Sequence, residues 1–152
     1  MAHFPNGIVV ITARQDGMDH AMTANSFTSV SLDPELVLFC VQKDSRFHAT
    51  IEQTHSWVVN FLSGSQADVA RWFAERGRPL ETQMDVVPHT RTASGVAVLA
   101  GTFAHMRCTT EARYDGGDHT IVVGRVDGIV DTDLDAPPLL YLDHRIVPPS
   151  GA

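Results

Sequence analysis

Three short polar stretches hold the side chains of this sequence that could bind a ligand or take part in a reaction. The first, TANSFTSVS at positions 23–31, carries a hydroxyl or an amide on six of its nine side chains. Such small groups let a flat, heteroatom-rich ring approach the backbone closely, so the stretch could be a platform for a ring. It could equally be a turn cluster, because Ser, Thr and Asn readily hydrogen-bond to their own backbone.

The second stretch is QKDSRF at positions 42–47, and the third is GGDHT at positions 116–120. Arg46 stands at an expected helix start, where its charge and free backbone amides could bind a phosphate. His119 stands at the start of an expected strand, where an imidazole beside a pocket could hydrogen-bond to a carbonyl or an amide. The alternatives are a solvated charged loop and an ordinary hairpin end.

Apolar and β-branched runs predict the strands that must position these stretches. Residues 8–13 and 56–62 have strand composition, and residues 36–41 are apolar throughout, which is typical of a strand buried on both faces. Residues 104–112 alternate apolar and polar, and the turn DGGD joins them to a strand beginning at His119. A last short strand is expected at LLYLD, and Gly124 and Gly128 suit the bends that close a small barrel.

Two helices are predicted, over residues 45–53 and 65–76. In the second, Ser65 is expected to cap the N-terminus with Asp68 in a capping box, and Gly77 to end the helix. Residues 77–95 hold two prolines and little periodicity, and this predicts a long loop. Trp57 and Trp72 are expected on the outer surface, where they would suit an apolar interface.

These elements amount to six or seven strands and two helices without βαβ alternation. The expected fold is therefore mainly β with helical insertions, a mostly antiparallel barrel in one domain over residues 1–152.

Composition excludes several classes of function. The net charge of -7 and the lack of a basic run argue against nucleic acid and anionic membranes as partners. No run is long enough for a membrane span, and MAHFPNGIVV does not have the pattern of a signal peptide, so a cytoplasmic protein with Cys40 and Cys108 reduced is expected. Rossmann, P-loop, GxSxG and zinc-ligand patterns are missing, and no metal is expected.

The order of the motifs resembles the flavin reductase family, which has the FMN-binding split-barrel fold, a Greek-key-like antiparallel barrel. The resemblance rests on FPNGIVVITA, AMTANSFTSVSLDPELVLFCV, KDSRF, WVVNFLSGSQADVARWFA, GDHTIVVGRV and PPLLY. In particular the chain is similar to the small reductase components of two-component flavin monooxygenases. This resemblance implies a homodimer that binds FMN or FAD and accepts hydride from NAD(P)H. Reduced flavin then passes to a partner oxygenase.

The resemblance also implies roles for individual residues. The isoalloxazine and ribityl groups would contact Thr23, Ala24, Asn25 and Ser26. The cofactor would then follow the next strand at Cys40, Val41 and Gln42, with its phosphate at Arg46. Phe73 would pack against it, and His119 would position the nicotinamide as the one residue of the catalytic step.

Four positions depart from the family pattern: Ala21, Phe47, Trp72 and Ile146. Phe47 replaces a small hydroxyl residue and Trp72 a basic one, so weaker binding of the phosphate is expected. Two other functions stay open, a split-barrel oxidase resembling pyridoxamine-phosphate oxidases and a flavin-binding electron-transfer protein without turnover. The choices between NADH and NADPH, and between FMN and FAD, are not decided by the sequence.

Overall fold

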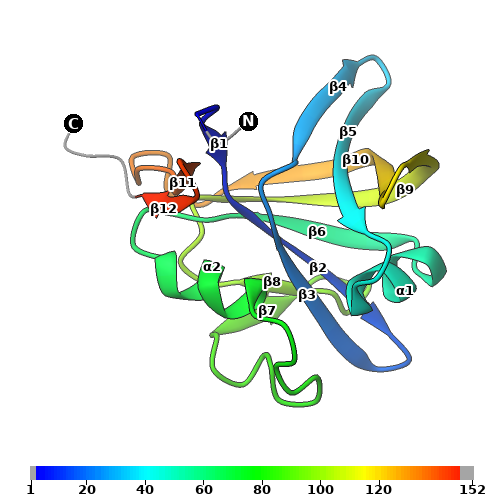
Figure 1. Ribbon diagram of the computed structural model, residues 1–152. Helices are drawn as coiled ribbons and strands as arrows, with labels where there is room; N and C mark the ends of the chain where they lie inside the picture. Colours follow the sequence, from blue (N-terminus) through cyan, green and yellow to red (C-terminus); the bar gives the residue numbers. More distant parts are fainter. Residues whose placement is uncertain (1–2, 148–152) are drawn as a thin grey trace.

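The computed structural model describes residues 3–147 and contains two short helices and twelve strands in that range (Figure 1). The helices are α1 (Arg46–Gln53) and α2 (Ala67–Ala74). The strands are β1 (Asn6–Gly7), β2 (Val9–Gln15), β3 (Met18–Ala24), β4 (Thr28–Leu32), β5 (Glu35–Gln42), β6 (Ser56–Phe61), β7 (His89–Arg91), β8 (Ala97–Leu99), β9 (Ala104–Gly116), β10 (His119–Asp131), β11 (Leu140–Leu142) and β12 (Arg145–Val147). The mainly β fold predicted from the sequence is confirmed.

Seven strands form one antiparallel sheet in the order β3-β2-β6-β9-β10-β5-β4. Its two edge strands, β3 and β4, follow each other in the chain and are joined by residues 25–27 alone. Such a link spans at most about 14 Å, so the two edges must approach each other. The sheet therefore curls round on itself while β3 and β4 stay unpaired with each other among the described residues.

The long β9–β10 hairpin bends at two glycines. The pairing register shifts between Val123 and Gly124 and again between Val126 and Gly128. A Cβ atom at Gly124 would collide with the indole ring of Trp57, so this position has room only for glycine beside that ring. The predicted role of Gly124 and Gly128 in bending the sheet is confirmed.

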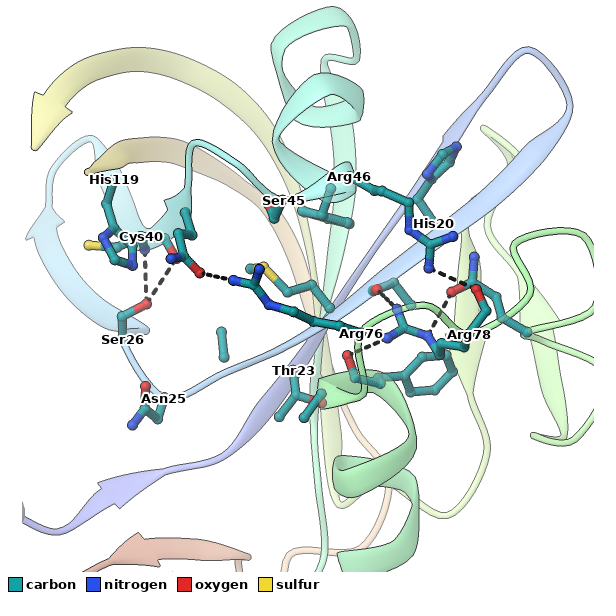
Figure 2. A pocket seen from close by; sticks show the side chains of 18 of the residues that line it. His20, Thr23, Asn25, Ser26, Cys40, Ser45, Arg46, Arg76, Arg78 and His119 are labelled. Atoms are coloured by element: carbon teal, nitrogen blue, oxygen red, sulfur yellow. Dashed lines mark hydrogen bonds between the residues drawn. The ribbon is translucent and has the colours of Figure 1, made fainter. Parts of the chain in front are cut away.

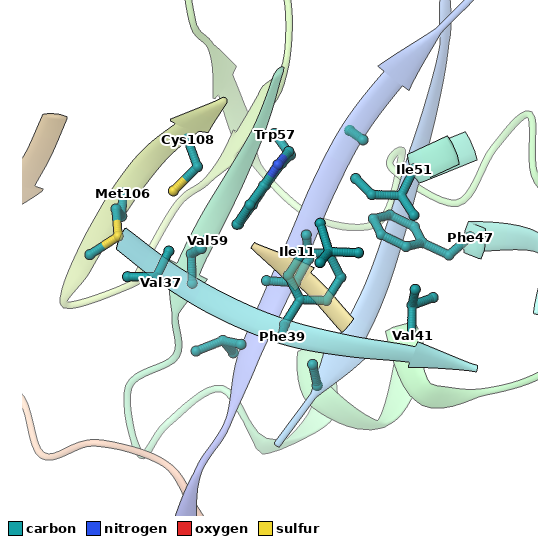
Figure 3. Close-up of a cluster of buried hydrophobic side chains, with 14 residues drawn as sticks. Ile11, Val37, Phe39, Val41, Phe47, Ile51, Trp57, Val59, Met106 and Cys108 are labelled. Carbon is teal, nitrogen blue, oxygen red and sulfur yellow. The ribbon is translucent and has the colours of Figure 1, made fainter. Parts of the chain in front are cut away.

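Apolar side chains from both halves of the curled sheet fill its interior (Figure 3). Phe39 and Trp57 meet edge to face with ring centroids 4.9 Å apart, and α1 adds Phe47 and Ile51. Trp57 is only 1% exposed, so its predicted place on the outer surface was wrong. The residue stands on a strand whose two faces are both covered.

Strand β5 also differs from the prediction, because its side chains alternate between buried and half-buried positions. Val37, Phe39 and Val41 point into the core, whereas Leu38 and Cys40 lie on the other face. An apolar sequence therefore does not make both faces equally buried here.

Helix α2 packs on β3 and β2 and is shorter at both ends than predicted. Its N-cap is Gln66 without a side-chain cap bond, because the Ser65 hydroxyl hydrogen-bonds to Ser63 instead. The helix ends before the C-cap Glu75, so neither the Ser65 cap nor the Gly77 stop is correct. Helix α1 begins as predicted, with the Ser45 side chain accepting from the backbone N–H of His48 at 3.2 Å.

The predicted long loop over residues 77–95 contains β7, which pairs with β8 in a hairpin that the sequence did not indicate. Asn60 fastens this hairpin to the sheet: its carbonyl accepts from Leu99 N–H at 2.8 Å, and its amide donates to Val10 O and Thr12 Oγ1. Within residues 3–147, no helix has the length and apolar character needed to cross a membrane.

Candidate functional site

A cavity of about 310 Å³ opens where β3, β5, α1 and the end of α2 meet (Figure 2). It is lined by His20, Ala21, Met22, Thr23, Ala24, Asn25, Ser26, Cys40, Gln42, Ser45, Arg46, Phe47, Phe73, Ala74, Arg76, Arg78, Leu80, Gln83 and His119. All three polar stretches of the sequence contribute to it. Its volume is at the lower end of the range of about 300–1,000 Å³ that is usual for small-molecule sites.

The stretch TANSFTSVS is not a simple connection between strands. Thr23 and Ala24 end β3, and Thr28 already belongs to β4. The Thr23 hydroxyl donates to the carbonyl of Ala70 on α2 at 2.7 Å, and Ser26 Oγ accepts from Cys40 N–H at 2.9 Å. These two hydroxyls therefore fasten this wall of the cavity to α2 and to β5. The wall itself consists of small side chains.

Strand β5 supplies the wall that faces this one. Cys40 and Gln42 line the cavity, whereas Val41 is 0% exposed in the core. Successive side chains of a strand point to opposite faces, so Val41 can offer a ligand only its backbone. Of the ten residues that the resemblance assigned to the site, Val41 alone does not line the cavity.

Among residues 3–147, three arginines line the cavity, whereas no aspartate or glutamate does. Arg78 donates to the carbonyls of Phe73, Glu75 and Ala21 and to the Gln83 side chain. Burial, and then the nearby Arg46, lower the pKa of Arg78 to about 10, so its guanidinium stays charged at neutral pH. The lining is thus cationic in a chain whose net charge is -7.

Two histidines complete the lining. The β10–β5 register places His119 opposite Gln42, and its Nδ1 lies 2.7 Å from the carboxylate of Asp118. This contact leaves Nε2 free to face a ligand. His20 Nδ1 lies 2.9 Å from the hydroxyl of Thr50, and burial, followed by Arg46, lowers the pKa of His20.

Sequence reasoning missed several lining residues, notably His20, Arg76, Arg78 and Gln83. The last three lie in or beside the segment that was predicted only as a loop. Its arginine pair in ERGRP, directly after an amphipathic helix, was the available signal. Among residues 3–147, no three His, Cys, Asp or Glu side chains come together in a way that could hold a metal ion.

The residues present fit a flavin phosphate and ring. Guanidinium groups bind phosphate through charge-assisted hydrogen bonds, and the cavity contains no carboxylate that would repel it. The small side chains of Ala24, Asn25 and Ser26 allow a ring to approach the backbone. Phe73 is only 2% exposed and borders the cavity beneath the Arg78 guanidinium, which lies 5.4 Å from the centroid of its ring. Phe47, one of the departures from the family pattern, packs its ring against Phe39 in the core and only borders the cavity.

Comparison with known proteins also points to a protein that binds flavin. The family model described as "Flavin reductase like domain" matches residues 1–150. An NADH-dependent FAD reductase of Streptomyces globisporus is 42% identical over 125 residues, which cover 81% of this chain and 68% of that protein. The chain therefore belongs to the flavin reductase like domain family.

Solved structures of relatives share the fold. The NADH:FAD oxidoreductase SgcE6 of S. globisporus superimposes with a TM-score of 0.92 at 35% identity, covering 99% of this chain and 89% of that one. BorF, the flavin reductase component of a bacterial two-component tryptophan halogenase, gives a TM-score of 0.89 at 39% identity, with 97% and 93% covered. The reductase subunit HsaB of a flavin-dependent monooxygenase from Rhodococcus jostii is 34% identical over 141 residues, covering 93% of this chain and 71% of that protein.

Proposed function

We propose that this protein is a flavin reductase that uses NADH, as its NADH-dependent relative does, and supplies reduced flavin to a partner monooxygenase. The observation that carries the proposal is the cavity itself, a cationic lining free of carboxylates beside a wall of small residues, with His119 at its edge. When bound there, a flavin accepts a hydride from the reduced nicotinamide and carries the chemistry.

The protein's own residues bind and orient the two reactants. Arg46, at the start of α1, holds the flavin phosphate. The segment from Thr23 to Ser26 supports the ring, with Cys40 and Gln42 along the opposite wall and Phe73 packed beside it. His119 Nε2 positions the nicotinamide. Holding the two rings together in this way is the protein's main contribution to the rate.

An oxygenase partner is proposed because relatives include a subunit and a component of two-component systems. We also infer that the curled sheet is a split barrel, that the 152 residues form one domain, and that the protein works as a homodimer in the cytoplasm. Exposed apolar side chains on the free edge strand β4, Val30 and Leu32, support the homodimer.

The test is the rate of NADH oxidation as a function of added FMN, FAD and riboflavin. A rate that rises and saturates with free flavin supports the proposal, and the same titration with NADPH ranks the two nicotinamides. A rate that is independent of added flavin, in protein already carrying FMN, would favour a split-barrel oxidase or an electron-transfer protein instead.

A further inference from the structure

Arg76 differs from the other two arginines of the cavity in what holds its side chain. Its Nη2 donates to the Gln42 side-chain oxygen at 2.7 Å and lies 3.5 Å from the carboxylate of Asp44. Both partners are side chains, and those of Arg76 and Asp44 are 71% and 65% exposed. An exposed pair of this kind contributes little to stability, so the guanidinium can leave it at low cost.

The guanidinium of Arg78 is fixed by backbone, and that of the exposed Arg46 is held by backbone through one hydrogen bond, with its other N–H groups left for a ligand. Arg78 donates to three carbonyls, and Arg46 donates to the carbonyl of Arg78 at 2.8 Å. A carbonyl within folded backbone cannot move aside without distorting the wall. Among the described residues, Arg76 is therefore the cavity arginine held by side chains alone, and it can change partners without moving backbone.

Arg76 also lies on the solvent-exposed side of the cavity. Figure 2 shows the Arg76 side chain between the labelled Thr23 and Ser45, and its hydrogen bond to Gln42 joins the segment after α2 to β5. A flavin that contacted both the β3 wall and the β5 wall would occupy the space that the guanidinium now crosses.

We propose that Arg76 exchanges partners on binding: it is held by Gln42 and Asp44 in the free protein and binds the flavin phosphate in the complex. This inference rests on the proposed function for the identity of the ligand. A phosphate accepts stronger, charge-assisted and bidentate hydrogen bonds from a guanidinium than a neutral amide does, so the exchange favours the complex. Arg76 thereby makes the site select phosphorylated flavins, FMN or FAD, over riboflavin.

The first test compares FMN and riboflavin binding to Arg76→Ala by quenching of flavin fluorescence. The Kd for FMN should rise about tenfold, as for a lost charge-assisted hydrogen bond, while that for riboflavin changes by less than about twofold. Arg76→Lys, which keeps the charge without the fork, should give an intermediate value for FMN. Arg71→Ala is the matched control, because Arg71 is an exposed arginine of α2 that pairs with Asp68 and does not line the cavity.

The second test removes the competitor. Asp44→Asn should tighten FMN by about two- to threefold and leave riboflavin unchanged, because it takes away one weak, exposed ion-pair partner of Arg76. Asp68→Asn, the same change at the exposed acid beside Arg71, should alter neither Kd.

Equal weakening of FMN and riboflavin by Arg76→Ala would overturn the inference, since it would mean that Arg76 only shapes the wall. So would no change in either Kd, or an effect confined to the KM for NADH, which would assign Arg76 to the nicotinamide. The Kd for each flavin is measured by fluorescence quenching and does not require turnover. If the wild-type protein binds no flavin, the proposed function fails; if it binds and reduces flavin while Arg76→Ala selects as before, only this inference fails.

Discussion

His119 is the residue proposed to position the second substrate, the nicotinamide. Its imidazole lies at the cavity edge with Nδ1 against Asp118, so Nε2 is the atom available to the nicotinamide. His119→Ala should raise the KM for NADH by about two- to tenfold, the range expected for one lost hydrogen bond, while the Kd for FMN stays the same. His55→Ala, at an exposed histidine outside the cavity, is the control. Equal losses in NADH and FMN affinity would make His119 a structural residue.

His20 gives a prediction about how the free energy of unfolding depends on pH. Burial, and then Arg46, lower its pKa in the folded protein below the ordinary 6.5, although Asp19 acts in the opposite direction. Below pH 6.5 the unfolded chain therefore binds a proton more readily than the folded one. The free energy of unfolding decreases as the pH is lowered from 6.5, until the pH passes the pKa of His20 in the folded protein. Urea unfolding from pH 8 to pH 5 should show this loss, and His20→Gln should flatten it. An unchanged pH dependence in the variant would assign the loss to other groups, such as His105, whose pKa burial also lowers.

The resemblance to the flavin reductases assigned ten contact residues, and the fold brings nine of them to one cavity. The side chain of Val41 lies in the core instead, because a motif does not say which of the alternating side chains of a strand faces the ligand. Arg76 and Arg78 could not be found in this way. Their positions depend on how the chain turns after α2, and only the three-dimensional packing of that segment against Ala21 and Gln42 determines it.

At the scale of elements, the bend of the β9–β10 hairpin depends on Gly124. Gly124→Ala should lower the free energy of unfolding by about 1–3 kcal/mol, the usual cost of overpacking, because its Cβ would meet the Trp57 ring. Gly7→Ala is the control, since nothing lies within 4 Å of a Cβ at that position. Chemical denaturation of the two variants makes the comparison. Equal stability would mean that the sheet can shift around Trp57, and the bend would then not depend on this glycine.

Strands and helices were predictable where pattern and packing agree, as in α1, β6 and the β9–β10 hairpin. The β7–β8 hairpin was missed because its strands are three residues each and are stabilised from outside by Asn60, 37 or more residues away from β8 in the chain. The predicted start of α2 was wrong because the Ser65 hydroxyl hydrogen-bonds to Ser63 and does not cap the helix. A capping pattern in the sequence does not reveal this.

For the whole molecule, the proposed homodimer needs an apolar surface to bury. Leu32 is 92% exposed and Val30 is 49% exposed, both on the edge strand β4, which pairs only with β5 among the described residues. Leu32→Glu should weaken the dimer by at least about tenfold, since it places a charge in an apolar contact. Val86→Glu is the control, because Val86 is also well exposed, at 65%, but lies outside β4. Sedimentation velocity measures both, and a dimer that tolerates Leu32→Glu would place the interface elsewhere.

Whether the protein reduces flavin with NADH and releases it can be measured by anaerobic mixing of the protein with FMN in large excess over the protein and NADH in excess over the FMN. The flavin absorbance reports how much FMN each chain reduces. We expect the whole FMN pool to be bleached, because each site binds, reduces and releases many molecules in turn. Bleaching that stops at one flavin per chain, or none at all despite measurable FMN binding, would contradict it.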